Sequence, residues 1–520
     1  MHGFEDASPT APRSLTRPWY REMNRYHWFV LAVAAMGWLF DTMDQQLFVL
    51  ARPAAMEDLM PAPRDADAKS LEALRQDRGR AGGIATSIFI AGWATGGLIF
   101  GMLGDRIGRA RTMIMTILLY SLFTGLSSLS QGVWDFAFYR FLTGLGVGGE
   151  FAVGVALVAE VMPGPARPYA LALLQALSGI GNVSAAFIFL GLGIAQEHGW
   201  IQQALGSGHI ATPWRIMFLV GALPAVVAVL IMRRLKEPER WQKVSHGGTV
   251  TTQLGSYREL FREPYLRSHA LFGLLLGCAG VIGLWSVGFY TFDLIRFVQR
   301  KPVTERIYTE QLRAATAQGD HAREQQLQAL LAKEADPSAV LAPNAEAVRT
   351  ELSGVVSGRL ARWSSYASIA MNLGAALGMF GFGALAQRIG RKPTFALAFL
   401  AAFISTLAVF WFLQDLWQIW VMVPVMGFCQ LSLFAGYAIY FPELFPTRLR
   451  STGTSFCYNV GRFIAAIGPS ALGLLRSGVY AGYPEPLDMR YAGITMCTVF
   501  LFGLVALPFL PETRGKPLPE

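Results

Sequence analysis

The stretch GMLGDRIGRAR at residues 101–111 ends one long apolar run and begins the next. GALAQRIGRKP at residues 383–393 does the same much later in the chain. When Gly101 is aligned with Gly383, the two stretches share Gly, Leu, Arg, Ile, Gly and Arg at matching positions. A short phrase repeated at the same place relative to an apolar run indicates an internal duplication.

A second pair of phrases supports the duplication. EVMPGPAR at residues 160–167 is matched by ELFPTRLR at residues 443–450, and aligning Glu160 with Glu443 shifts the register by a single position from the first alignment. Two repeats whose mutual spacing agrees so closely predict a duplicated unit and two bundles in parallel orientation. A substrate site is then expected near the middle of the membrane, between the bundles.

The composition predicts an all-α polytopic membrane protein. Of the 520 residues, 53% are hydrophobic and only 15% are charged, whereas soluble domains are about 25% charged. The formal net charge is +9, but the basic residues lie between apolar runs and form no continuous stripe, which excludes a nucleic-acid-binding surface. The positive charge is instead typical of cytoplasmic loops.

Twelve runs reach the roughly 20 apolar residues that cross a bilayer. They lie at 27–50, 84–104, 111–130, 134–161, 168–195, 214–233, 269–297, 363–386, 393–413, 417–441, 450–475 and 489–511. Lys and Arg follow the even-numbered runs, and the short loops after runs 3, 5 and 9 have none, so the positive-inside rule places both termini in the cytoplasm of a plasma (inner) membrane.

These runs divide the chain into a tail, two bundles and a linker. The expected parts are a cytoplasmic tail at 1–26, a six-helix bundle at 27–233, a cytoplasmic linker at 234–268, a second bundle at 269–511 and a short tail at 512–520. An insert at 298–362 is expected outside the cytoplasm, where its Leu spacing predicts a short amphipathic helix without chemistry of its own.

The chemistry-bearing motifs of enzymes and primary pumps are missing from the sequence. The four cysteines lie in apolar runs without metal or disulfide spacing, and there is no Gly-x-x-x-x-Gly-Lys phrase or nucleophile–base arrangement. We therefore expect no cofactor, no metal and no enzymatic activity. The expected partners are a small-molecule substrate, protons and the lipid bilayer, with no nucleic acid, and the protein is expected to be monomeric.

The repeated phrases carry a family resemblance. G-x-L-x-D-R-x-G-R, its copy in the second half and PETRG at 511–515 resemble the major facilitator superfamily. YRFLTGLGVGGE at 139–150 and ELFPTRLRSTGTSFCYNVGR at 443–462 are similar to its metabolite–proton, aromatic-acid–proton and sugar-porter branches. The resemblance implies a twelve-helix secondary transporter that works by alternating access.

The repeated phrases also predict a gate. Glycines let helices approach closely, and the Asp105 carboxylate is expected to hold the positive N-terminal end of a helix from the other half. Such a contact would lock one access state, and Gln387 in the second copy would make the lock asymmetric. The alternative is that the phrase only supplies positive charge that sets the orientation in the membrane, which would explain the arginines but not the glycines or Asp105. The predicted gating residues are Gly101, Gly104, Asp105, Arg106, Gly108, Arg109, Glu160, Arg167, Arg388, Arg391, Glu443 and Arg450.

Four charged residues lie inside predicted spans, where each costs roughly 2.5–3.5 kcal/mol and usually marks function. Asp41 and Asp44 are in the first span, and Arg140 and Glu150 are in the fourth. The sugar-porter resemblance, through the Asp-Thr phrase of the first span, implies that Asp41 pairs with Arg140. Our hypothesis is that Asp41 carries the proton, that Arg140 adjusts the proton affinity of Asp41, and that Asp44 and Glu150 assist in proton coupling. The alternative is a structural ion pair without proton coupling.

Arg462, well inside the eleventh span beside Tyr458 and Asn459, predicts a bidentate partner for a substrate carboxylate. Other polar residues of the spans are cavity candidates, although the same types also form interhelical hydrogen bonds. They are Gln175, Asn182, Tyr290, Asn372, Gln430 and Tyr437.

The seventh and tenth spans lack the Gln-Gln, Asn and Gly-Pro-x-x-Trp elements of sugar porters. The Asp-x-x-Asp phrase of span 1 resembles that of aromatic-acid symporters, although Thr42 stands where those usually have Gly. The predicted function is proton-coupled symport of a small organic anion. The alternative is a sugar or polyol–proton symporter, or a drug exporter, on the same fold.

Overall fold

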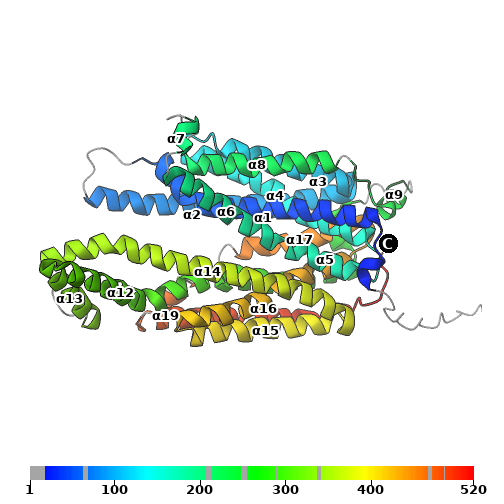
Figure 1. Ribbon diagram of the computed structural model, residues 1–520. Helices are drawn as coiled ribbons and strands as arrows, with labels where there is room; N and C mark the ends of the chain where they lie inside the picture. The colour runs from blue at the N-terminus through cyan, green and yellow to red at the C-terminus, as the bar shows by residue number, and fades with distance from the viewer. Residues whose placement is uncertain are drawn as a thin grey trace, which may run out of the picture.

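The computed structural model describes residues 18–61, 68–197, 200–205, 212–232, 234–246, 254–288, 290–336, 341–465, 471–472, 474–484 and 486–519, and this part of the chain contains helices and no strand. Figure 1 shows the helices running side by side in two groups, one from each half of the chain. The helices of the first half are α1 (Arg25–Leu59), α2 (Ala68–Ile107), α3 (Arg109–Ser127), α4 (Val133–Val161), α5 (Arg167–Ala176), α6 (Ser178–Glu197), α7 (Trp200–Leu205) and α8 (Pro213–Met232).

A linker with two short helices leads into the second half. The linker helices are α9 (Glu239–His246) and α10 (Tyr257–Arg262). The second half contains α11 (Pro264–Gly283), the π-helical turn η3 (Leu284–Gly288), α12 (Tyr290–Gln318), α13 (His321–Ala335), α14 (Pro343–Ile389), α15 (Arg391–Phe412), α16 (Ile419–Leu444), α17 (Arg450–Ala465), α19 (Leu487–Cys497) and α20 (Val499–Ala506).

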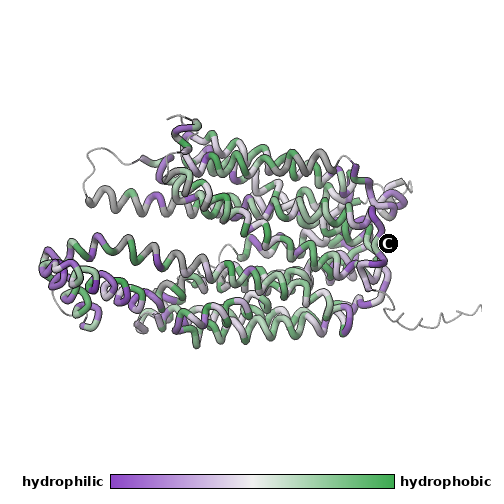
Figure 2. The backbone as a smooth tube through the Cα atoms, in the orientation of Figure 1, coloured by the Kyte–Doolittle hydropathy of each residue, from purple (hydrophilic) through white to green (hydrophobic). Residues whose placement is uncertain are grey.

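Nine segments of the described chain are long and apolar enough to cross a membrane. The other three predicted spans coincide with α1, α8 and α17. Asp41 and Asp44 lower the mean hydropathy of α1, Pro213–Leu223 of α8 forms a shorter apolar helix among the residues searched, and α17 is described over 16 residues. Figure 2 shows apolar residues along the bundle and polar residues at its ends. The twelve-helix fold predicted from the sequence is confirmed.

The two halves repeat the same close helix packing. In the first half, a Cβ at Gly92 or Gly96 of α2 would overlap the backbone of α4, and in the second half a Cβ at Gly374 or Gly378 of α14 would overlap the backbone of α16. Glycine at these positions therefore lets each pair of helices cross at backbone contact.

The repeated phrase forms the tight turn after α2 and after α14. Gly108 and Gly390 end these helices with φ of 113° and 103°, a conformation that glycine adopts without strain. Glu237 then accepts hydrogen bonds from the first backbone N–H groups of α3, at 3.1–3.2 Å, and Glu512 does the same for α15, at 2.9–3.0 Å. Each half thus caps its own turn with a carboxylate that follows its last span.

The region expected as an insert, 298–362, is largely an extension of two membrane helices. α12 continues unbroken to Gln318, α13 follows, and α14 begins at Pro343, so there are three helices where one short helix was expected. They share a small apolar core that includes Ile307, Leu327 and Leu352. The Leu spacing of this segment therefore serves packing among these three helices, which project from the bundle at one end (Figure 1).

Candidate functional site

The halves are joined at the end of the bundle where residues 105–109 meet the start of α17, which we call the latch end. The Asp105 carboxylate of α2 accepts hydrogen bonds from the backbone N–H groups of Ser451 and Thr452, at 3.1 and 2.8 Å, and from the Thr452 hydroxyl. These N–H groups belong to the first turn of α17, which has no internal acceptors for them. Asp105, fully buried, thus caps a helix of the opposite half.

A buried ion-pair chain extends this contact. Glu160 of α4 lies 3.0 Å from Arg109 and 2.7 Å from Arg450, so one carboxylate bridges arginines from both halves. Arg109 also pairs with Asp105 at 2.9 Å and donates to the Thr447 carbonyl of the second half. This arrangement closes the bundle at the latch end.

Two glycines bring α2 and α17 together. A Cβ at Gly101 would overlap Ser455, and a Cβ at Gly104 would lie 2.7 Å from the Ser451 hydroxyl. The predicted close approach of the phrase is therefore between halves, and it holds Asp105 within reach of the α17 backbone.

The second copy of the phrase makes its contacts inside the second half. Arg391 pairs with Glu443 at 2.8 Å, and Thr513 donates to the same carboxylate at 2.6 Å. Gln387 accepts a hydrogen bond from Arg391 at 3.2 Å instead of capping a helix of the first half. The asymmetry expected from Gln387 is thus visible in the contacts.

Three predicted gating residues take other positions. Arg106 donates to the Leu254 carbonyl of the linker at 3.1 Å, and Arg388 lies on the exposed side of α14. Arg167 begins α5 and is buried there. The sequence groups these arginines with the gate by their place in the phrases, but successive helix positions point to different faces.

Asp41 and Glu150 form a buried acidic pair near the middle of the bundle. Both are at most 1% exposed, and none of their four carboxylate oxygens has a hydrogen-bond partner in the described part of the chain. A Cβ at Gly37, one turn before Asp41, would overlap the Glu150 carboxylate. Glu150, Asp44 and Arg462 are the charged groups that act on Asp41.

The predicted pairing of Asp41 with Arg140 is wrong. Arg140 lies 3.5 Å from Asp44, donates to the Ser127 hydroxyl at 2.7 Å and packs over the Phe218 ring. Asp44 also accepts a hydrogen bond from the Thr124 hydroxyl at 2.7 Å. Because Asp41 and Asp44 lie three residues apart, they leave α1 about 60° apart, and it is Asp44 that meets Thr124 of α3 and the Arg140 side chain.

Arg462 of α17 lies between two aromatic rings from different halves. Its guanidinium carbon is 4.0 Å from the Trp93 ring centroid and 4.3 Å from that of Tyr458. Nη1 donates to Asn459 at 2.8 Å and to the Tyr458 carbonyl at 3.1 Å, whereas Nε has no acceptor among the described residues. The Tyr458 ring stacks on Phe151 of α4, with centroids 3.9 Å apart.

Gln175 and the two asparagines also lie between the halves. Gln175 of α5 interacts with Tyr458, and Asn182 of α6 donates to Asn372 of α14 at 3.3 Å. Asn459 is fully buried against Gly97 of α2. These predicted cavity residues therefore contribute to the contact surface between the bundles.

Two predicted cavity residues are used inside the second half instead. Gln430 donates to Thr406 at 2.6 Å, and Tyr437 donates to the Leu276 carbonyl at 2.9 Å while its ring stacks on Phe441. Both are at most 1% exposed, so these interhelical hydrogen bonds are the alternative use of polar residues. Tyr290 is half-buried and begins α12, directly beyond η3.

Several residues of these sites were missed from the sequence. Trp93 gives no signal in the sequence, because a tryptophan in an apolar run is ordinarily a packing residue. Trp241 of the linker, which donates to the Asp105 carbonyl at 2.7 Å, gives none either. Glu237, which caps α3, has a detectable signal: KEPER at 236–240 stands after the sixth span, as PETRG stands after the twelfth.

Comparison with known proteins agrees with this architecture. The sequence profile of the Major Facilitator Superfamily matches residues 29–300 and 339–520. The chain belongs to the Major Facilitator Superfamily. A relative from Haemophilus influenzae, assigned by name to metabolite transport, is 27% identical over 504 residues, covering 96% of this chain and 99% of its own.

Two other matches within the Major Facilitator Superfamily bear on the site and the fold. The cis,cis-muconate transport protein of Acinetobacter baylyi is 26% identical over 441 residues, covering 84% of this chain and 86% of its own. The solved proton:xylose symporter XylE superposes with a TM-score of 0.58 at 17% identity, covering 95% of this chain and 98% of that one. As a member of this superfamily, the protein is a multi-pass membrane transporter of small molecules and not an enzyme.

Proposed function

We propose that the protein couples the movement of a small organic anion, such as an unsaturated or aromatic carboxylate, to that of protons. The observation that carries the proposal is Arg462, a buried guanidinium held between Trp93 and Tyr458 whose Nε has no acceptor among the described residues. A planar guanidinium that has an unused N–H donor and lies between two aromatic rings suits a planar carboxylate ligand. The cis,cis-muconate transport activity named for the Acinetobacter relative supports this substrate class.

The acidic pair supports proton coupling. Two carboxylates that share a dry site do not both ionise, so we propose that Asp41 and Glu150 hold a proton between them while the latch is closed. Arg462 is the cation that acts on Asp41. A substrate carboxylate that engages Arg462 would reduce its attraction for the Asp41 charge and so favour protonation, which ties substrate binding to proton binding.

The contacts at the latch end, which we call the latch, supply the alternation between the two access states. With both termini in the cytoplasm, the latch end is the cytoplasmic end, and Asp105, Glu160 and Arg450 close it in the present state. We propose that opening withdraws α17 from Asp105 and moves Tyr458 and Arg462 away from Phe151 and Trp93. The two bundles would then part at the site itself, which exposes the acidic pair to cytoplasmic water.

Uptake into proteoliposomes tests the proposal. Radiolabelled cis,cis-muconate and benzoate are offered with an inward proton gradient, and xylose is added as a competitor. We expect gradient-driven accumulation of at least one acid and no competition from xylose. Competition by xylose without accumulation of either acid would contradict the substrate class.

Two variants separate binding from coupling. Arg462→Lys retains the charge but loses the fork, so it should raise the substrate concentration needed for half-maximal uptake. Asp41→Asn should abolish accumulation against a gradient while substrate exchange across the membrane persists. Glu346→Gln, an exposed residue of the α12–α14 projection, is the control. Undiminished accumulation by Asp41→Asn would refute proton coupling through this residue.

A further inference from the structure

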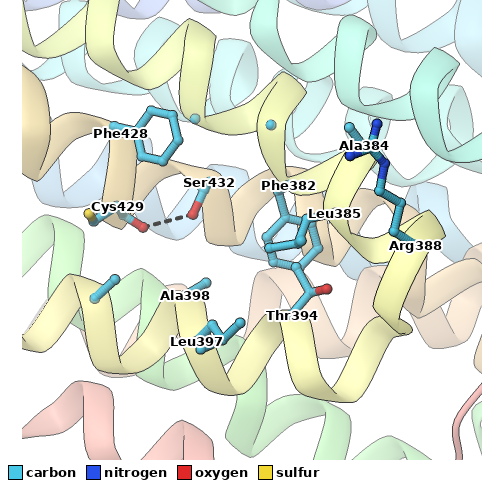
Figure 3. Close-up of a pocket in the computed structure, with 13 residues that line it drawn as sticks. Phe382, Ala384, Leu385, Arg388, Thr394, Leu397, Ala398, Phe428, Cys429 and Ser432 are labelled. Atoms are coloured by element: carbon cyan, nitrogen blue, oxygen red, sulfur yellow. Dashed lines mark hydrogen bonds between the residues drawn. The ribbon is translucent and has the colours of Figure 1, made fainter.

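A groove on the outer surface of the second half lies between α14, α15 and α16. It has a volume of about 410 Å³, within the size range of small-molecule sites, and its lining is mostly apolar. Figure 3 shows Leu385 and Phe382 of α14, Leu397 of α15, and Phe428 and Ser432 of α16 around it. Small residues create the space: Gly381, Ala384, Ala398 and Ala401.

One end of the groove carries a cation. Arg388 lies in the last turn of α14, where the apolar span Tyr366–Ile389 ends, and its side chain is exposed. In Figure 3 its side chain turns back along α14 toward Ala384. Arg388 has no hydrogen bond or ion pair within the part of the chain that the structure describes. A guanidinium therefore stands at the polar boundary of a lipid-facing apolar groove.

The equivalent helices of the first half carry larger side chains at three of these positions. When the two halves are aligned through Gly101 and Gly383, Gly381, Ala384 and Ala401 correspond to Ile99, Met102 and Leu119, which are larger. The internal repeat thus provides a comparison in which larger side chains stand at the positions that correspond to the small residues of the groove.

The equivalent arginine of the first half is also occupied. Arg106 corresponds to Arg388 and donates to the Leu254 carbonyl, and Gly255 lies against Met102 and Arg106. The linker supplies this cover and exists only once in the chain. Among the described residues, no segment of the chain covers Arg388 and its groove in the way that Leu254 and Gly255 cover Arg106.

We propose that the groove is a binding site for an acidic phospholipid, with its phosphate at Arg388 and an acyl chain along the apolar lining toward Phe428. The groove faces the bilayer and its cation lies at headgroup depth, which suits an anionic lipid. The Ser432 and Thr394 hydroxyls are directed to their own helices, to the Cys429 and Gly390 carbonyls. Both hydroxyls therefore already have acceptors, which suits an apolar ligand in the deeper part of the groove.

Photo-crosslinking locates the lipid. The full-length protein is reconstituted in vesicles of phosphatidylcholine with a minor fraction of phosphatidylglycerol that carries a diazirine on an acyl chain, and crosslinked peptides are mapped by mass spectrometry. We expect adducts within residues 378–401 or 428–432, and few at the equivalent positions 96–119 of the first half. Equal labelling of both halves would show that lipid surrounds the protein without a specific site, and it would overturn the proposal.

Native mass spectrometry tests the headgroup contact. Retention of phosphatidylglycerol should fall about fivefold in Arg388→Ala, the factor that one cation near an anionic leaflet is worth, and should be preserved in Arg388→Lys. Arg111→Ala, an exposed arginine at the same end of the first half, is the matched control and should retain the wild-type level. Unchanged retention in Arg388→Ala would overturn the proposal.

A groove-filling variant tests the acyl-chain contact. Gly381→Ile with Ala401→Leu copies the first half and should reduce lipid retention while leaving Arg388 exposed. Glycerol phosphate, which has the headgroup and no chain, distinguishes a phosphate site from a lipid site. Displacement of the phospholipid by glycerol phosphate at similar concentrations would show that the groove contributes nothing and would reject the acyl-chain assignment.

Discussion

Asp41 and Asp44 are the same residue type, three positions apart on one helix, with opposite environments. Asp44 has an arginine at 3.5 Å and a hydroxyl donor at 2.7 Å, whereas Asp41 has another carboxylate beside it and no hydrogen-bond donor among the described residues. A buried carboxylate that accepts hydrogen bonds stabilises the fold. A buried carboxylate without hydrogen-bond donors raises the free energy of the folded state, and such residues usually have a functional role.

This difference predicts opposite effects on stability. Asp44→Asn leaves Arg140 as a buried charge without its anion, so we expect a loss of about 3–5 kcal/mol in stability and a clearly lower melting temperature in detergent. Asp41→Asn removes a carboxylate that has no donor among the described residues, so we expect an unchanged or higher melting temperature. Thermal unfolding of the two variants, measured side by side at neutral pH, checks both expectations. Equal destabilisation of both would contradict the separate environments.

At this scale the sequence identified the charged residues but not their pairing. Asp41, Asp44, Arg140 and Glu150 could be found because charge inside an apolar run is rare and costly. Which acid meets Arg140 depends on helix rotation and on the reach of a long side chain, and a resemblance to other porters did not supply that. The partners of Arg462 were hidden for a related reason: Trp93 belongs to the opposite half of the sequence and looks like packing.

At the scale of an element, α17 is held at its first turn by a residue of α2. The Asp105 carboxylate accepts hydrogen bonds from two backbone N–H groups and one hydroxyl of that turn. Trp241 of the linker donates a hydrogen bond to the Asp105 backbone carbonyl. The sequence allowed this contact to be predicted, because an acid fixed between glycines at the end of a span has few other uses. It did not show that Glu160 joins Arg109 to Arg450, since each of these residues could equally pair within its own half.

Asp105→Asn should weaken the latch. The variant loses the charge that interacts with the α17 N-terminus, worth up to about 2 kcal/mol in a buried site, and leaves Arg109 with one anion fewer. Spin labels at Arg111→Cys and Lys392→Cys, on opposite halves of the latch end, should report a larger fraction of long distances in pulsed EPR. Asp135→Asn is the matched control, because Asp135 caps α4 within its own half. An unchanged distance distribution in Asp105→Asn would contradict the latch.

The carboxylate that caps α15 predicts a pH dependence. Burial acts to raise the pKa of Glu512, but backbone N–H groups of Arg391, Lys392 and Arg514 outweigh it and lower the pKa from its usual value of 4.5. A depressed folded-state pKa stabilises the protein above about pH 4.5, and this stabilisation is lost as the pH falls through the folded value.

Glu512→Gln should therefore be less stable than the wild type at neutral pH, and the difference should shrink on acidification below about pH 4.5. Melting temperatures measured between neutral pH and the acid limit of the detergent sample check this. A difference that stays constant across that range would show that Glu512 stabilises the turn without its charge.

At the scale of the whole molecule, the two halves share a plan and differ where function requires it. The internal repeat was readable because both phrases recur in the same order and at nearly the same spacing, and it correctly predicted the paired bundles. The projection formed by α12, α13 and α14 was underestimated, since its amphipathic pattern does not reveal that it continues two spans. The groove at Arg388 could not be predicted from the sequence, because small residues scattered along α14 and α15 form it only when these helices pack with α16.

The asymmetry of the latch itself can be tested by restoring the missing acid. A Cβ at Gly383 would lie 2.6 Å from that of Ala172 in α5, much as Gly101 lies against Ser455 of α17, so Gln387 is placed near the start of α5. The repeat gives Pro168 and Tyr169 at the positions of Ser451 and Thr452, and proline has no N–H to donate. An acid here would meet one backbone donor where Asp105 meets two.

Gln387→Asp should therefore add a weak second latch, worth about 0.3–1 kcal/mol through the α5 N-terminus. That energy shifts the equilibrium toward the closed latch by roughly two- to fivefold, which slows uptake by a comparable factor if latch opening limits the cycle. The spin-label pair at positions 111 and 392 should show fewer long distances. Gln387→Ala removes the hydrogen bond to Arg391 without adding charge and should not close the latch further. If Gln387→Asp and Gln387→Ala behave alike, the start of α5 does not attract an acid, and the single latch reflects the backbone of α5 and not the choice of residue at 387.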